Sequence, residues 1–191
     1  PPPPGAPPPP PGAPGDPAPV AVGFLPWQLF AGDDADRRAL GLARWPDAAP
    51  WSDRAFDRER GWRHVGPGTD HDTSGAGVIW DDAAVGDAAD SLAATGLSFE
   101  GCVGVLNTGH WKTMAAVVDD HVAGEAHFAY ANGRCGAGCP GTAYNADGKG
   151  RYYFEGCEAA LASGDDEWTY DAGRDHLLLR LAGGAHPDGA G

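Results

Sequence analysis

The stretch RYYFEGCEAALASGDDEWTYDAGRDHLLLRL (residues 151–181) carries the pattern that decides the fold. Apolar and polar residues alternate around Tyr152, Trp168 and Leu177, and Gly-Asp-Asp interrupts the pattern at 164–166. A period of two turns one face of each strand inward, and Gly and Asp favour the turn that lets two strands pair. The stretch therefore predicts a packed β scaffold.

The rest of the chain repeats this pattern of short apolar runs separated by turn residues. Helical periodicity is almost absent, and 30 glycines favour turns and bulges. The polar segment GDDADRR (32–38) predicts a hairpin turn, and GCEAALAS (156–163) predicts one short helix. We expect an all-β, antiparallel sandwich-like domain. The expected strands are 27–31, 39–45, 77–82, 102–109, 112–122, 125–131, 151–156, 167–171 and 176–182.

The N-terminal segment differs from the rest in composition. Residues 1–19 hold twelve of the 18 prolines and no aromatic residue. Proline fixes φ and lacks an N–H, so this segment cannot form a core. We expect a disordered, Pro-rich linker over 1–19 and a β-rich domain over 20–191.

The charge balance limits the classes of partner. The formal net charge is −14, and Lys and Arg are not clustered as phosphate binding requires. No apolar run approaches the 18 or so residues of a transmembrane helix. The sequence therefore predicts no nucleic-acid partner and no membrane insertion.

Four cysteines leave several arrangements open. Disulfides in an oxidising compartment, free buried thiols and a metal site are all compatible with the count, although the usual zinc spacing is missing. The motif CGAGC places Cys135 and Cys139 where they could close a small loop. We therefore note a possible Cys135–Cys139 disulfide and expect no metal and no cofactor.

The candidate binding residues are aromatic residues next to polar ones. A tryptophan ring can stack on a sugar face while neighbouring polar groups bind hydroxyls. The alternative for Trp111 is that it packs in the core. The alternative for the aromatic residues of the long loop 46–76 is that they form an interface with another domain. The candidates for carbohydrate binding are Trp51, Trp62, Asn107, His110 and Trp111.

Two groups of titratable residues carry a less specific signal. Glu167 and Asp171 are four residues apart on one expected strand, too far for a catalytic pair, and we interpret them as solvated turn acids. His64, Asp70, His71 and Asp72 share one polar loop but lack a rigid ligand spacing. We therefore predict no catalytic residue.

Three segments together resemble extracellular right-handed parallel β-helix proteins. The segments are WQLFAGDD…LGLARWPDA (27–48), LAATGLSFEGCVGVLNTGHWKTMAAVV (92–118) and RYYFEGCEAALASGDDEWTYDAGRDHLLLRLAGG (151–184). Asp47 replaces the family's Asn, and Asp165-Asp166 replaces its Pro-Gly. In that family, which includes glycoside hydrolases and has polysaccharide lyases as relatives, such a region is a sandwich-like element near the start of the solenoid. The first strands of the β-helix could belong to this region.

The resemblance implies an accessory role. The family's catalytic carboxylates lie on β-helix rungs, which the sequence up to Gly191 does not contain. We expect a non-catalytic accessory or capping domain of a secreted β-helix protein that binds or degrades polysaccharide, located extracellularly or at the cell surface. Its partner would be polysaccharide or the parent β-helix domain. An independent carbohydrate-binding module and a structural piece of the extracellular matrix or cell wall are the alternatives.

Overall fold

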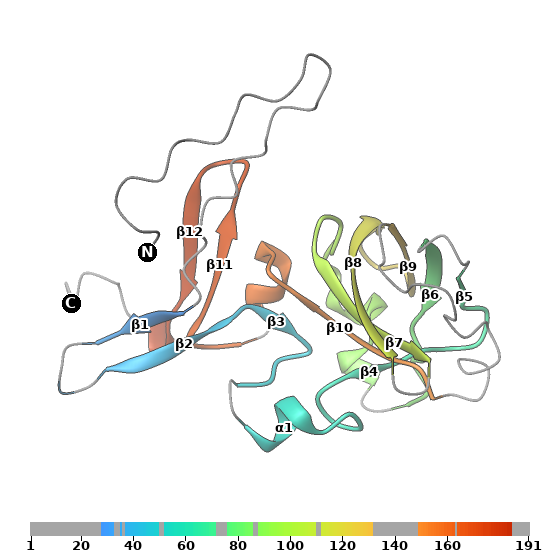
Figure 1. The fold of residues 1–191 in the computed structure, drawn as a ribbon, viewed down its shortest axis with the longest axis horizontal. Helices are drawn as coiled ribbons and strands as arrows, with labels where there is room; N and C mark the ends of the chain where they lie inside the picture. Colours follow the sequence, from blue (N-terminus) through green and yellow to red (C-terminus); the bar gives the residue numbers. More distant parts are fainter. Residues whose placement is uncertain are drawn as a thin grey trace, which may run out of the picture.

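The computed structural model confirms an all-β, sandwich-like fold. It describes residues 28–32, 35, 37–49, 52–71, 76–85, 88–109, 112–131, 149–162 and 164–184. The expected linker over 1–19 lies outside these residues. None of the described helices is long and apolar enough to cross a membrane. The strands form one sheet of four strands and one of eight (Figure 1).

The smaller sheet has the strand order β1-β2-β11-β12. The predicted hairpin is confirmed, since β1 and β2 pair antiparallel with Leu29 opposite Leu40. β11 and β12 form a second hairpin, and β11 runs parallel to β2. A small apolar cluster of Leu40, Trp168 and Leu181 lies in this sheet. The strands are β1 (Leu29–Ala31), β2 (Arg38–Leu42), β11 (Glu167–Asp171) and β12 (His176–Arg180).

The larger sheet has the order β3-β10-β7-β8-β9-β6-β5, and β4 also pairs with β10. All of its pairings are antiparallel, as an alternating pattern with one buried face predicts. Its strands are β3 (Arg44–Trp45), β4 (Arg63–His64), β5 (Asp70–His71), β6 (Gly77–Trp80), β7 (Val103–Gly109), β8 (Lys112–Asp120), β9 (His127–Ala131) and β10 (Arg151–Glu155).

Helices are confined to single turns. The short helix predicted over 156–163 is a 3-10 helix, η3 (Glu158–Ala162), because the few residues between β10 and β11 cannot nucleate a longer α-helix. A one-turn α-helix, which the sequence did not predict, lies in the long loop. The helices are α1 (Asp53–Phe56), η1 (Ala88–Asp90), η2 (Ala93–Thr95), η3 and η4 (Ala182–Gly184).

The main core is an aromatic cluster beneath the larger sheet. The Trp45 ring lies 5.0 Å from Phe99 and 5.7 Å from Phe154, and Phe128 contacts both Tyr152 and Phe154. All five side chains are buried. Trp45 is therefore a core residue.

A buried ion pair crosses this core. Arg63 donates from Nε and Nη2 to the two oxygens of Asp81 at 3.0 and 2.9 Å. Tyr152 donates its hydroxyl to Asp81 at 2.7 Å, and the Leu92 amide donates at 2.9 Å. Burial alone would lower the pKa of Arg63, but the Asp81 carboxylate outweighs it and raises that pKa. The charges are thus fully paired.

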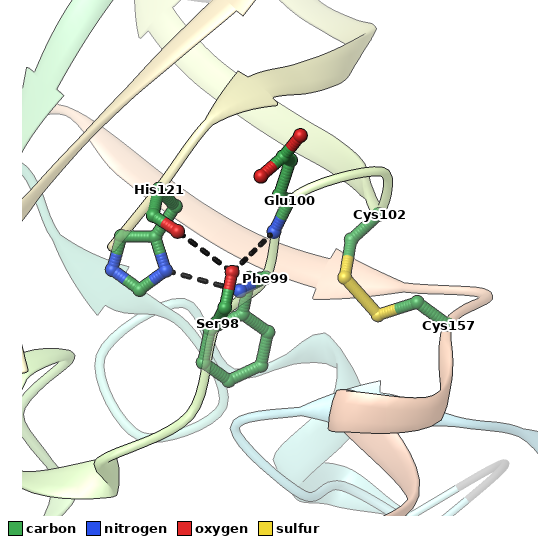
Figure 2. The surroundings of a disulfide bond; sticks show 6 residues. All are labelled: Ser98, Phe99, Glu100, Cys102, His121 and Cys157. Atoms are coloured by element: carbon green, nitrogen blue, oxygen red, sulfur yellow. Dashed lines mark hydrogen bonds between the residues drawn. A yellow bond between two sulfur atoms is a disulfide. The ribbon is translucent and has the colours of Figure 1, made fainter. Parts of the chain in front are cut away.

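A disulfide joins Cys102 and Cys157 with 5.1 Å between their Cα atoms. It connects the residue before β7 to the turn after β10, next to the pair Val103–Glu155 of these strands. Beside it, the Phe99 amide donates to Nδ1 of the buried His121 at 3.0 Å (Figure 2). Of the arrangements that the sequence left open, Cys102 and Cys157 thus adopt the disulfide. Cys135 and Cys139 lie outside the described residues.

Replacing Asp81 with Ala should destabilise the domain by about 3–5 kcal/mol, because it leaves the Arg63 guanidinium buried without its partner. Urea unfolding of Asp81→Ala measures this loss. Asp119→Ala removes an exposed acid from β8 and serves as the matched control. An equal, small effect of both substitutions would contradict the assigned role of the ion pair.

Removing the disulfide should cost about 4 kcal/mol in the free energy of unfolding, because it closes a loop with a sequence separation of 55. Urea unfolding of the double variant Cys102→Ala/Cys157→Ala tests this value. A Cys135→Ser/Cys139→Ser variant should remain as sensitive to reducing agent as the parent chain. Insensitivity of that second variant would show that Cys102–Cys157 does not supply the stabilisation.

Candidate functional site

A pocket of about 350 Å³ lies where the loop 46–64 meets the larger sheet. It combines one tryptophan ring with charged side chains of both signs. Most of the lining comes from the first part of the long segment 46–76. The lining residues are Pro46, Arg54, Glu59, Arg60, Trp62, Arg63, His64, Val85 and Asp90.

The loop folds locally through capping and one close approach. Ser52 caps α1 by accepting from the Ala55 amide at 3.3 Å. The Gly61 amide donates to the Asp57 carbonyl at 2.7 Å and closes the turn. A Cβ at Gly61 would lie 1.9 Å from the Arg54 carbonyl oxygen, so the loop requires glycine there.

Arg44 of β3 holds this loop against the sheet. Its Nη2 donates to the Gly61 carbonyl at 2.6 Å, and its guanidinium lies 4.0 Å from the centre of the Tyr153 ring. Trp62 meets Tyr153 edge to face, with 4.6 Å between ring centres. Trp62 Nε1 is buried and has no hydrogen-bond partner within the described part of the chain. The indole is thus fixed while its N–H remains uncommitted.

Glu59 is held by Arg151 of β10. Nη2 of Arg151 donates to both Glu59 oxygens, at 2.9 and 2.8 Å. His64 Nε2 lies 3.6 Å from the same carboxylate. Burial, together with the positive charge of Arg151, lowers the pKa of His64, so the imidazole is neutral at pH 7. The positive charge of Arg151 therefore neutralises the Glu59 carboxylate in this wall of the pocket.

The structure separates the predicted carbohydrate-binding residues. Trp62 lines the pocket, but Asn107 does not. The buried Asn107 amide accepts from Arg58 at 2.7 Å and donates to Thr113 at 3.1 Å. Trp51, His110 and Trp111 lie outside the described residues, and their proposed roles stay predictions.

Sequence reasoning missed the charged part of the pocket. Five of the 13 Lys and Arg residues fall within 44–63, in a chain of net charge −14. This local density of arginine was the feature of the sequence that could have indicated the charged part of the pocket. Glu59 and Arg151 could not be joined from the sequence, because they are 92 residues apart and meet only through the fold.

The interpretation of Glu167 as a solvated turn acid is wrong. The residue begins β11 with only 1% of its surface exposed, and its carboxyl group lies so close to Gly164 that a Cβ there would be 2.6 Å from the carboxyl carbon. Asp171, at the other end of β11, does cap a turn by accepting from the Gly173 and Arg174 amides.

Within the described residues, no group of three or more His, Cys, Asp or Glu side chains could hold a metal ion. Comparison of the chain with protein-family models, with curated proteins and with solved structures finds no match. The resemblance to β-helix proteins therefore stays a prediction.

Protonation of His64 should lower the free energy of unfolding as the solution becomes acidic. Its folded-state pKa lies below the unfolded value of about 6.5, so the unfolded chain binds more protons near pH 6 and stability is lost as the pH falls. Urea unfolding at pH 7 and pH 5 should show a smaller acid-induced loss for His64→Gln than for the parent chain. The exposed His176→Gln is the control, and equal losses in all three proteins would contradict the assignment.

Proposed function

We propose that this chain is a non-catalytic accessory domain of a secreted protein that binds or degrades polysaccharide, and that it holds a sugar residue in the pocket at Trp62. The pocket carries this proposal because it joins an anchored indole to a rim of hydrogen-bonding side chains. Sugars have apolar ring faces and equatorial hydroxyls, so they suit such a mixed wall. A volume of about 350 Å³ accommodates one or two sugar units.

The polar groups of the pocket favour binding over hydrolysis. A glycoside hydrolase needs one carboxyl that donates a proton and a second, free carboxylate. Both oxygens of Glu59 are already hydrogen-bonded by Arg151. This leaves Asp90 as the other acid of the lining. Such an arrangement supports recognition of hydroxyls through fixed charged groups.

The disulfide supports the secreted setting of the proposal. Disulfides such as Cys102–Cys157 persist in oxidising compartments and are rare in the cytosol. The strongly acidic composition disfavours nucleic acid and anionic membranes as partners, which leaves polysaccharide or a neighbouring protein domain.

One surface feature favours an additional capping role. Leu42, Leu177 and Leu179 of the smaller sheet are 40%, 47% and 39% exposed. The strand register places all three on the face that carries Trp168. An exposed apolar sheet face of this kind suits contact with a neighbouring domain of a parent protein, the β-helix in our proposal.

Calorimetric titration with neutral and uronate-containing oligosaccharides tests the binding proposal. We expect dissociation constants near the millimolar range, and Trp62→Ala should weaken binding about fivefold to tenfold, since a stacked aromatic ring contributes about 1–1.4 kcal/mol. Trp80→Ala is the matched control, because Trp80 is exposed outside the pocket and stacks on His127.

The absence of binding to every oligosaccharide would overturn the proposal. Equal weakening by Trp62→Ala and Trp80→Ala would overturn the assignment of the pocket. Near-ultraviolet circular dichroism of both variants distinguishes loss of binding from loss of fold.

A further inference from the structure

Two carboxyl groups from distant parts of the chain converge over Gly164. A Cβ built at Gly164 would lie 2.7 Å from Asp47 Oδ1 and also 2.7 Å from Glu167 Oε2. The two oxygens can therefore be no farther apart than twice that distance. Asp47 follows β3 of the larger sheet, whereas Glu167 begins β11 of the smaller sheet. The carboxyl groups meet where the sheets join.

The surroundings of Glu167 do not neutralise a negative charge. The Arg44 amide donates to Oε1 at 3.3 Å, and Oε2 has no partner in the described ranges of the chain. Glu167 is 1% exposed, so its carboxyl group is shielded from bulk solvent. Two ionised carboxylates at this separation repel strongly in a buried site, and one retained proton removes the repulsion.

Other charged groups face the pair but are engaged elsewhere. The guanidinium of Arg44 reaches Gly61 and Tyr153. Arg180 of β12 donates to the Leu161 carbonyl and lies 3.4 Å from Asp165. The charge of Arg54 on α1 favours ionised Asp47, whereas that of Asp165 disfavours it. These contacts favour ionisation of Asp47 before Glu167.

We propose that Asp47 and Glu167 hold one proton between them, and that this proton keeps the four-stranded sheet fastened to the eight-stranded sheet. The Arg44 amide of β3, which donates to Glu167 Oε1 at 3.3 Å, joins the two sheets at the same place. At Glu167, the Gly41 amide donates to the Asp166 carbonyl at 2.8 Å and the Ala43 amide donates to the Trp168 carbonyl at 2.7 Å, which joins β11 to β2 within the four-stranded sheet. Release of the proton places two like charges directly beside these bonds. The junction is then a pH-sensitive contact that loosens in alkaline solution.

The direction of the pH effect follows from proton binding. Burial, and next the Asp47 charge, raise the pKa of Glu167 to about 8. Burial also raises the pKa of Asp47. The folded chain thus binds more protons than the unfolded chain between about pH 4.5 and 8, and stability falls as the pH rises through that range. One retained proton changes the unfolding equilibrium constant by at most about tenfold per pH unit.

Carboxyl-carbon NMR titration combined with urea unfolding from pH 5 to pH 9 tests this inference. The parent chain should show one carboxyl that titrates near pH 8; this signal should be absent in Glu167→Gln and shifted to lower pH in Asp47→Asn. The alkaline loss of stability should shrink in Glu167→Gln. Glu100→Gln, a substitution of an exposed acid, should behave like the parent chain.

Two results would overturn the inference. One is that every carboxyl titrates below pH 6 in the parent chain. The other is that millimolar Ca²⁺ stabilises the parent chain but not Glu167→Gln, which would make the pair a cation site. If Glu167→Gln does not fold, the titration of Asp47→Asn decides alone. None of these results depends on whether the pocket binds a sugar.

Discussion

The buried ion pair between Arg63 and Asp81 is the constraint on which the larger sheet and its pocket depend. A charge in the interior is tolerated only with a partner and further hydrogen bonds, and Asp81 has both. Through this carboxylate, β4, β10 and the segment before η2 are held in one arrangement. The sequence neighbours of Arg63 are Trp62, which directly precedes β4, and His64 of β4; both therefore occupy fixed positions in the pocket wall.

The remainder of that wall is positioned by charge and backbone dipoles more than by apolar packing. α1 has no buried residue, and Phe56 is exposed. The Arg44 side chain donates to the backbone carbonyls of Ala55 and Gly61, and Arg151 donates to the Glu59 carboxylate. Arginine suits this role because its planar fork donates several hydrogen bonds at once. The clustering of arginine in 44–63 thus has a structural reason.

The alternating pattern was sufficient to predict the long strands and the hairpin of β1 and β2, because each has one buried face that the sequence displays directly. It predicted β2 and β3 as one strand over 39–45, and it did not predict β4 and β5, which have two residues each. The burial of Glu167 was equally hidden. It depends on Gly164 and Asp47, and Asp47 is 120 positions earlier in the chain. Trp62 could be proposed from composition, whereas the Glu59–Arg151 pair required the fold.

Arg44 links the pocket to the carboxyl pair. Its backbone amide donates to the Glu167 carboxyl group, while its side chain donates to the Gly61 carbonyl. Pro46, which lines the pocket, precedes Asp47, which faces Glu167. A shift of β3 at the junction would therefore move two elements of the pocket wall in the same step. For this reason, the position of β3 determines both the contact between the sheets and the shape of the pocket.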